Sequence, residues 1–181
     1  MAILYGRSFR GKVMYFSLTP LPYSSDNPNS YEIRYGTTHD NKDIVLRRNV
    51  HGWQFGHSHI ERLAEAFANV QVLRSFRGFK SVTPALCDGL DWLNVVLLDS
   101  SSKRFPDGVT LHLYIAEPQH EMDIENTEHP EDTVYIRFGF STDAESVCKF
   151  GQELIIETNQ AREERMRLGV ATEEDIFFNY D

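Results

Sequence analysis

Segments with strand-like alternation follow one another along this chain, and their order restricts the fold more than any other feature of the sequence. Over residues 12–19, Met14, Phe16 and Leu18 alternate with residues that would occupy the opposite face of a strand. Three further segments have a similar character: residues 3–5, 31–35 and 43–47. Strands in runs, without a helix between each pair, favour antiparallel pairing over a β-α-β arrangement.

Two segments show the helical period instead. The first covers residues 58–70, and Ser58 precedes a glutamate by the three residues of a capping box. A second capping box begins at Thr142, and the long helix that follows it is expected to stop at Gly169. The charged second half of that helix, residues 162–167, is expected to project into solvent.

In the middle of the chain, the sequence predicts two strands and leaves the secondary structure of one further segment open. Leucines at helical spacing overlap an apolar run at residues 95–98, which suits a buried strand equally well. A turn at residues 106–108 leads into a strand over residues 109–116. We expect this strand to pair antiparallel with another over residues 133–140.

These elements predict an α+β fold, a mainly antiparallel sheet with two or three helices packed on it and a long C-terminal helix. A chain of 181 residues with 41% hydrophobic residues can bury one ordinary core. We expect a single α+β domain over residues 1–169 and an acidic-aromatic C-terminal tail over residues 170–181.

Cysteine content and hydropathy indicate a cytoplasmic protein that does not enter a membrane. Cys87 and Cys148 lie in apolar-periodic stretches and are read as reduced core residues. No apolar run approaches the roughly 18 to 20 residues that span a bilayer, and the N-terminus lacks the apolar core of a signal peptide. No cofactor motif or activated nucleophile stands out, so neither a cofactor nor catalytic residues are predicted, and enzyme activity is not favoured.

The first part of the chain is net basic and the second part is net acidic. Residues 1–80 contain 11 Lys and Arg against 6 Asp and Glu, whereas residues 81–181 contain 7 against 21. The leading hypothesis is therefore a non-enzymatic acidic interaction protein, a binding or inhibitory subunit of the kind that neutralises a toxin or nuclease, with a basic protein partner. The predicted partner-binding residues are Glu121, Asp123, Glu125, Glu128, Glu131, Asp132, Ile176, Phe177 and Phe178. The alternatives are a merely solvated hairpin loop over residues 117–132 and a tail that packs back on its own domain.

A basic and aromatic motif occurs twice, and it suggests a nucleic-acid-binding subunit of a larger complex. Arg-Ser-Phe-Arg-Gly begins at Arg7 and again at Arg74. Arginine provides forked donors for phosphate, and phenylalanine can stack on bases. The candidate phosphate or nucleic-acid residues are Arg7, Arg10, Lys12, Arg74, Arg77 and Lys80. The competing interpretation is that these cations pair with the acidic half of the chain.

The third hypothesis is a metal-dependent hydrolase or nuclease. An H-x-H pair on a strand points both imidazoles to one face, where a third ligand would complete a site with an open position for water. The candidate ligands are His51, His57, His59 and Glu61. Surface histidines beside inward-packed aromatic residues are the competing interpretation.

Overall fold

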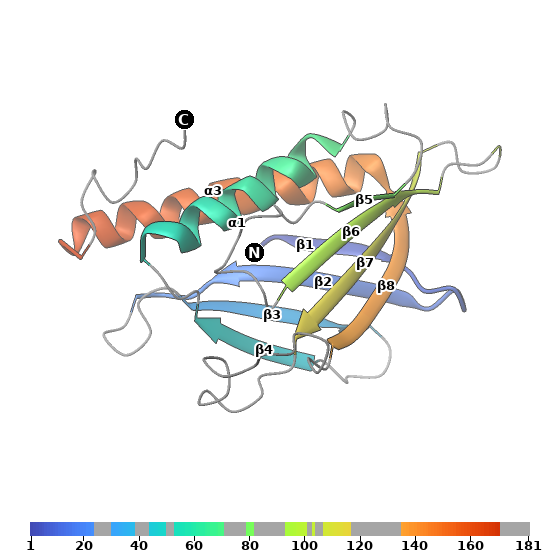
Figure 1. Ribbon diagram of the computed structural model, residues 1–181, viewed down its shortest axis with the longest axis horizontal. Helices are drawn as coiled ribbons and strands as arrows, with labels where there is room; N and C mark the ends of the chain where they lie inside the picture. The colour runs from blue at the N-terminus through green and yellow to red at the C-terminus, as the bar shows by residue number, and fades with distance from the viewer. Residues whose placement is uncertain are drawn as a thin grey trace, which may run out of the picture.

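The structure, a computed structural model, describes residues 1–23, 30–38, 44–49, 53–70, 79–81, 93–100, 103, 107–116 and 135–170 (Figure 1). Its strands are β1 (Ile3–Arg7), β2 (Val13–Pro20), β3 (Ser30–Thr37), β4 (Ile44–Asn49), β5 (Phe79–Ser81), β6 (Leu93–Asp99), β7 (Gly108–Ala116) and β8 (Tyr135–Asp143). Its helices are α1 (Trp53–Ala68) and α3 (Ala144–Arg167). This is the α+β class that the order of the sequence patterns predicts.

All the strands within these ranges belong to one antiparallel sheet of eight strands, in the order β4-β3-β2-β1-β8-β7-β6-β5. Two four-stranded meanders thus meet where β1 pairs with β8, and each meander is followed by a helix. The predicted antiparallel pairing of residues 109–116 with residues 133–140 is confirmed by the β7–β8 ladder. The open assignment at residues 95–98 resolves as strand, because this run lies inside β6.

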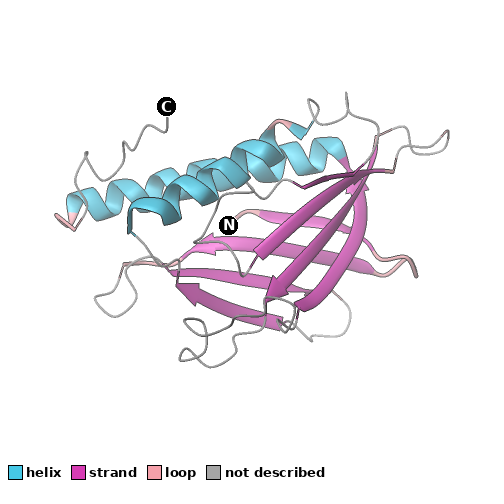
Figure 2. Ribbon diagram, in the orientation of Figure 1, coloured by secondary structure: helices cyan, strands magenta, loops and turns pink. Residues whose placement is uncertain are grey.

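The sheet curls strongly, so that residues on distant strands meet across its inner face. Tyr35 on β3 and Phe138 on β8 have ring centroids 4.8 Å apart, although β2 and β1 lie between their strands. Three strand spacings in a flat sheet would separate them by about 14 Å. Figure 2 shows the second meander crossing in front of the first as a result of this curl.

The two helices pack against each other on the concave side, and α3 also packs on β1, β2 and β8. Phe150 of α3 links the layers, because its ring lies 5.6 Å from that of Phe16 on β2 and 5.2 Å from that of Phe67 on α1. A Cβ atom at Gly151 would lie 2.2 Å from the backbone nitrogen of Ala68. The helices can therefore approach this closely only with glycine at that position.

Helix α1 begins five residues earlier than the capping-box pattern predicts. It starts at Trp53, so Ser58 lies inside the helix and does not cap it. The prediction of a helix start at Ser58 was wrong, because the helical backbone already includes residues 53–57 and the buried apolar face begins at Ile60.

The predicted capping box at Thr142 was also wrong. Thr142 is still part of β8, and its hydroxyl donates to the Tyr5 carbonyl oxygen at 2.8 Å. The N-cap is Asp143, whose carboxylate accepts from the Ser146 backbone N–H at 2.7 Å. The predicted stop at Gly169 is confirmed, with a Schellman-type bond from the Val170 N–H to the Arg165 carbonyl oxygen.

Within the described part of the chain, neither helix is both long and apolar enough to cross a membrane. Cys148 is a free thiol that lies 2.9 Å from the Ala68 carbonyl oxygen, at the contact between α3 and α1. Cys87 lies outside the described residues.

Candidate functional site

The tip of the β1–β2 hairpin is a well-defined turn that carries the first copy of the basic and aromatic motif. The Gly11 N–H donates to the Ser8 carbonyl oxygen at 2.8 Å, which makes Phe9 and Arg10 the two corner residues of a β-turn. Gly11 has φ +76°, a conformation that glycine adopts without strain. Further bonds from the Arg7 guanidinium to the Gly11 carbonyl and from the Lys12 N–H to the Ser8 hydroxyl hold the turn in shape.

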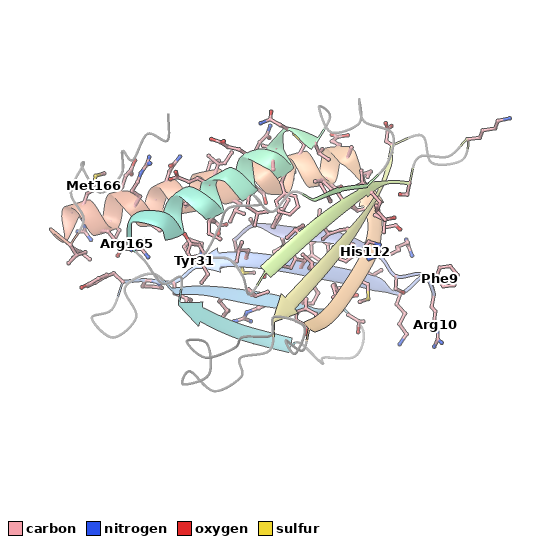
Figure 3. The ribbon with its side chains drawn as sticks, in the orientation of Figure 1. Phe9, Arg10, Tyr31, His112, Arg165 and Met166 are labelled. Carbon is pink, nitrogen blue, oxygen red and sulfur yellow. The ribbon has the colours of Figure 1, made fainter. Side chains whose placement is uncertain are left out.

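This turn displays its side chains to solvent. Phe9 is 106% exposed relative to the reference state, and Arg7, Arg10 and Lys12 are all exposed. Figure 3 shows Phe9 and Arg10 at the tip, at one end of the long axis of the molecule. The turn therefore brings together three of the predicted phosphate-binding residues and one aromatic ring.

An aromatic pair extends this surface along the strands. Tyr5 lies on the same face of β1 as Arg7 and is 52% exposed. Its ring lies 6.4 Å from that of Tyr15, its cross-strand partner on β2. Sequence reasoning missed Tyr5, because alternation shows that Tyr5 and Leu4 lie on opposite faces but not which face the helices cover.

The second copy of the motif is described only where it enters β5. Lys80 lies in this strand, whereas Arg74 and Arg77 lie outside the described residues. Successive strand pairings place Arg7, Ser141, Thr110, Leu98 and Phe79 in one row across the sheet. The strand that follows the second copy thus begins in the same row in which β1 ends.

A second group of polar residues, buried or half-buried, lies on α1, α3 and β3, and Figure 3 shows its members Tyr31 and Arg165 at the opposite end of the molecule. We call Tyr31, Glu61, Thr158, Arg162 and Arg165 the polar cluster. Tyr31 and Thr158 have no exposed surface, and Arg165 is 1% exposed. The Arg162 guanidinium donates to the Glu61 carboxylate at 3.2 Å. The prediction that residues 162–167 project into solvent was therefore wrong for Arg165, because β3 and α1 enclose it.

Burial dominates the ionisation of the polar cluster. It raises the pKa of the Tyr31 phenol far above its ordinary value, an effect that the nearby Arg165 charge partly offsets. It also lowers the pKa of the Arg165 guanidinium and raises the pKa of the Glu61 carboxyl, against the opposing effect of Arg162. Burial thus keeps the Tyr31 phenol neutral, and the Arg162–Glu61 ion pair links α3 to α1 beside it.

The histidines adopt a different arrangement from the strand pair of the metal hypothesis. His57 and His59 both lie in α1, where residues two apart do not face each other, and His51 lies outside the described residues. Glu61 is engaged by Arg162. Among the described side chains, no three His, Cys, Asp or Glu residues gather as a metal site would require. Metal binding by the full histidine segment stays a prediction.

The predicted partner-binding residues of the acidic loop and tail all fall outside the described ranges. They are Glu121, Asp123, Glu125, Glu128, Glu131, Asp132, Ile176, Phe177 and Phe178. Their role stays a prediction.

No family model, curated protein or solved structure matches this chain. Its chemistry must therefore be inferred from its own residues.

Proposed function

We propose that the protein is a non-enzymatic interaction protein, a binding or inhibitory subunit that engages a basic protein partner through residues 117–132 and 170–181. The distribution of charge supports this proposal. The described residues carry 14 Lys and Arg against 11 Asp and Glu, a balance of +3, whereas the whole chain carries −9. The remaining segments therefore carry −12, and the acidic loop and tail supply 11 of their 16 carboxylates.

Several carboxylates of the described fold have structural partners of their own. Glu61 binds Arg162, Glu157 lies 2.7 Å from the N-terminal amine, and Asp143 caps α3. Such engaged groups contribute to the fold. A dense run of seven carboxylates in residues 117–132 instead produces a local negative field that steers and orients a basic surface.

A pull-down with two charge-matched variants tests the proposal. The first variant neutralises the loop through Glu121→Gln, Asp123→Asn, Glu125→Gln and Glu128→Gln. The control neutralises four exposed helical carboxylates, through Glu65→Gln, Glu145→Gln, Glu163→Gln and Glu164→Gln. Both variants have the same net charge, so a difference between them reports the location of the charge and not its amount.

The expected result is a basic protein that the wild-type chain and the helix variant retain at low salt and that the loop variant loses. Retention should fall when salt is raised, because exposed charges are screened over about 8 Å at physiological ionic strength. Equal retention by the loop variant and the control would overturn the role of the loop. Retention by neither the wild type nor any variant would overturn the proposal.

A further inference from the structure

The hairpin tip has the attributes of a recognition element and not of a solvated connection. An aromatic ring with no covering surface buries apolar area only when a partner arrives, and such rings commonly anchor binding sites. The four hydrogen bonds within residues 7–12 fix the turn before any partner binds. A preformed turn of this kind loses little conformational freedom on binding.

The spacing of the exposed groups suits an extended polymer of bases and phosphates. Tyr5 and Arg7 occupy alternate positions on β1, roughly 6.6 Å apart, and Phe9 follows them at the corner of the turn. Aromatic faces that alternate with cations in this way stack bases and neutralise the phosphates between them. Helices α1 and α3 cover the opposite face of the sheet, so the Tyr5 face stays accessible.

The local charge favours a polyanion even though the whole chain is acidic. The first acidic residue of the sequence is Asp26, so residues 1–25 carry only Arg7, Arg10 and Lys12. On the next two strands of the sheet, the hydroxyls of Ser141 on β8 and Thr110 on β7 lie 3.0 Å apart and add neutral hydrogen-bonding groups to the same row. Screening confines the repulsion from distant acids to about one Debye length.

We propose that the outer face and tip of the β1–β2 hairpin bind single-stranded nucleic acid. Tyr5 and Phe9 would stack on bases, and Arg7, Arg10 and Lys12 would contact phosphates. An anionic membrane is the weaker occupant, because a membrane-inserting loop needs apolar groups only at its tip, whereas Tyr5 and Tyr15 lie back along the strands. This surface is distinct from the acidic segments of the proposed function.

Strand β5 lies in the same sheet as the hairpin, within a short distance of the proposed binding surface. Phe79 lies in the row of Arg7, four strands away, which is about 19 Å along the curved sheet. At about 3.4 Å per nucleotide of a stacked strand, this distance corresponds to about 6 nucleotides, within the roughly 4 to 16 that a single-strand binding fold covers. The strand β5, which follows the second copy of the motif in the sequence, is thus within reach of a nucleic acid bound at the tip.

Fluorescence anisotropy with a labelled oligouridylate of about 12 nucleotides tests the proposal. The informative variants are Phe9→Ala, Phe9→Trp and the double change Arg10→Ala with Lys12→Ala. The matched control combines Ile156→Ala with Arg167→Ala, which removes one exposed apolar side chain and one exposed cation from α3. Circular dichroism confirms that each variant is folded, and phosphatidylserine vesicles provide the membrane comparison.

We expect the wild type to bind the oligonucleotide saturably and to lose affinity between about 50 and about 200 mM salt. Phe9→Ala should weaken oligonucleotide binding about tenfold, whereas Phe9→Trp, which keeps an aromatic ring, should bind like the wild type. The double variant of Arg10 and Lys12 should show a smaller salt dependence of binding. The control should bind like the wild type. The proposal is overturned by absence of saturable wild-type binding, by an equal loss in the control, or by vesicle binding that requires Phe9 while the oligonucleotide does not bind.

Discussion

Each end of the molecule has an aromatic residue and an arginine close together, exposed at one end and buried at the other. At one end, Phe9 and Arg10 stand in solvent on a hairpin turn, and at the other, Tyr31 and Arg165 are enclosed by β3, α1 and α3. A buried charge is costly to desolvate, so the fold depends on the neighbouring groups that compensate for that cost. An exposed ring and cation stabilise the fold little and are available to a partner. Burial, and not residue type, separates Arg165 from Arg10, the arginine that we propose to contact nucleic acid.

The largest expected effect is a loss of stability on substitution of Arg165 in the polar cluster. Arg165→Ala should reduce the free energy of unfolding by about 3 kcal/mol, because it removes a fully buried side chain and the charge facing Tyr31. Urea denaturation measures the loss. Oligonucleotide binding at the hairpin tip should not change. A loss below about 0.5 kcal/mol would mean that Arg165 contributes no more than an ordinary surface residue.

Arg165→Met separates the charge of this residue from its volume. Methionine refills most of the space without a charge to desolvate, so the loss should be clearly smaller than for Arg165→Ala. Equal losses for the two variants would show that the specific geometry of the guanidinium, and not packing, stabilises this end.

The next effect concerns the close contact between the two helices. Gly151→Ala should reduce stability by about 2 kcal/mol, because the added Cβ would lie 2.2 Å from the Ala68 nitrogen and 2.6 Å from the Ala64 carbonyl oxygen. In an unobstructed helix the same substitution would gain about 1 kcal/mol. Thermal unfolding therefore gives a result whose sign is informative, and a gain in stability would contradict this close packing.

A smaller effect is expected at the start of α3. Asp143→Ala should cost about 1 kcal/mol because the Ser146 N–H loses its acceptor, whereas Asp143→Asn should retain most of the stability. Both can be measured by urea denaturation. If Asp143→Ala is neutral, the cap does not contribute to the helix pair.

The smallest effect is a pH dependence at Glu61. Burial raises the pKa of this carboxyl above its ordinary value of 4.5, so the folded state binds the proton more tightly than the unfolded chain. The stabilising contribution of the protonated Glu61 carboxyl is fully present below pH 4.5. It is lost as pH rises from 4.5 through the raised pKa. Relative to Glu61→Gln, the wild type should lose stability across this interval in urea titrations. If the wild type instead gained stability relative to Glu61→Gln as pH rises, the ion pair with Arg162 would outweigh the effect of burial on the Glu61 pKa.

The strands could be predicted from the sequence because alternation is a local property. Residues 12–19 and 109–116 alternate clearly; β2 includes the first segment from residue 13 on, and β7 includes the whole of the second. The helix starts could not be predicted as well, because tertiary contacts decide them. Thr142 has the sequence position of a cap, but its hydroxyl is taken by the Tyr5 carbonyl, and Asp143 caps the helix instead.

The candidate site was predictable in part for a related reason. The repeated motif identified Arg7, Arg10 and Lys12, but which face of β1 is open depends on where the helices pack, so Tyr5 was missed. Arg165 sits in a run of charged residues that looks exposed throughout. Only the approach of Tyr31 from β3, more than a hundred residues away in sequence, explains its burial.

The most direct test of this account measures stability and binding on one variant, Phe9→Ala. We expect an unfolding free energy within about 0.5 kcal/mol of wild type, because the ring has no covering surface, together with about tenfold weaker oligonucleotide binding. A shifted unfolding midpoint with unchanged oligonucleotide affinity would contradict it, since the exposed end would then be structural and not a recognition surface.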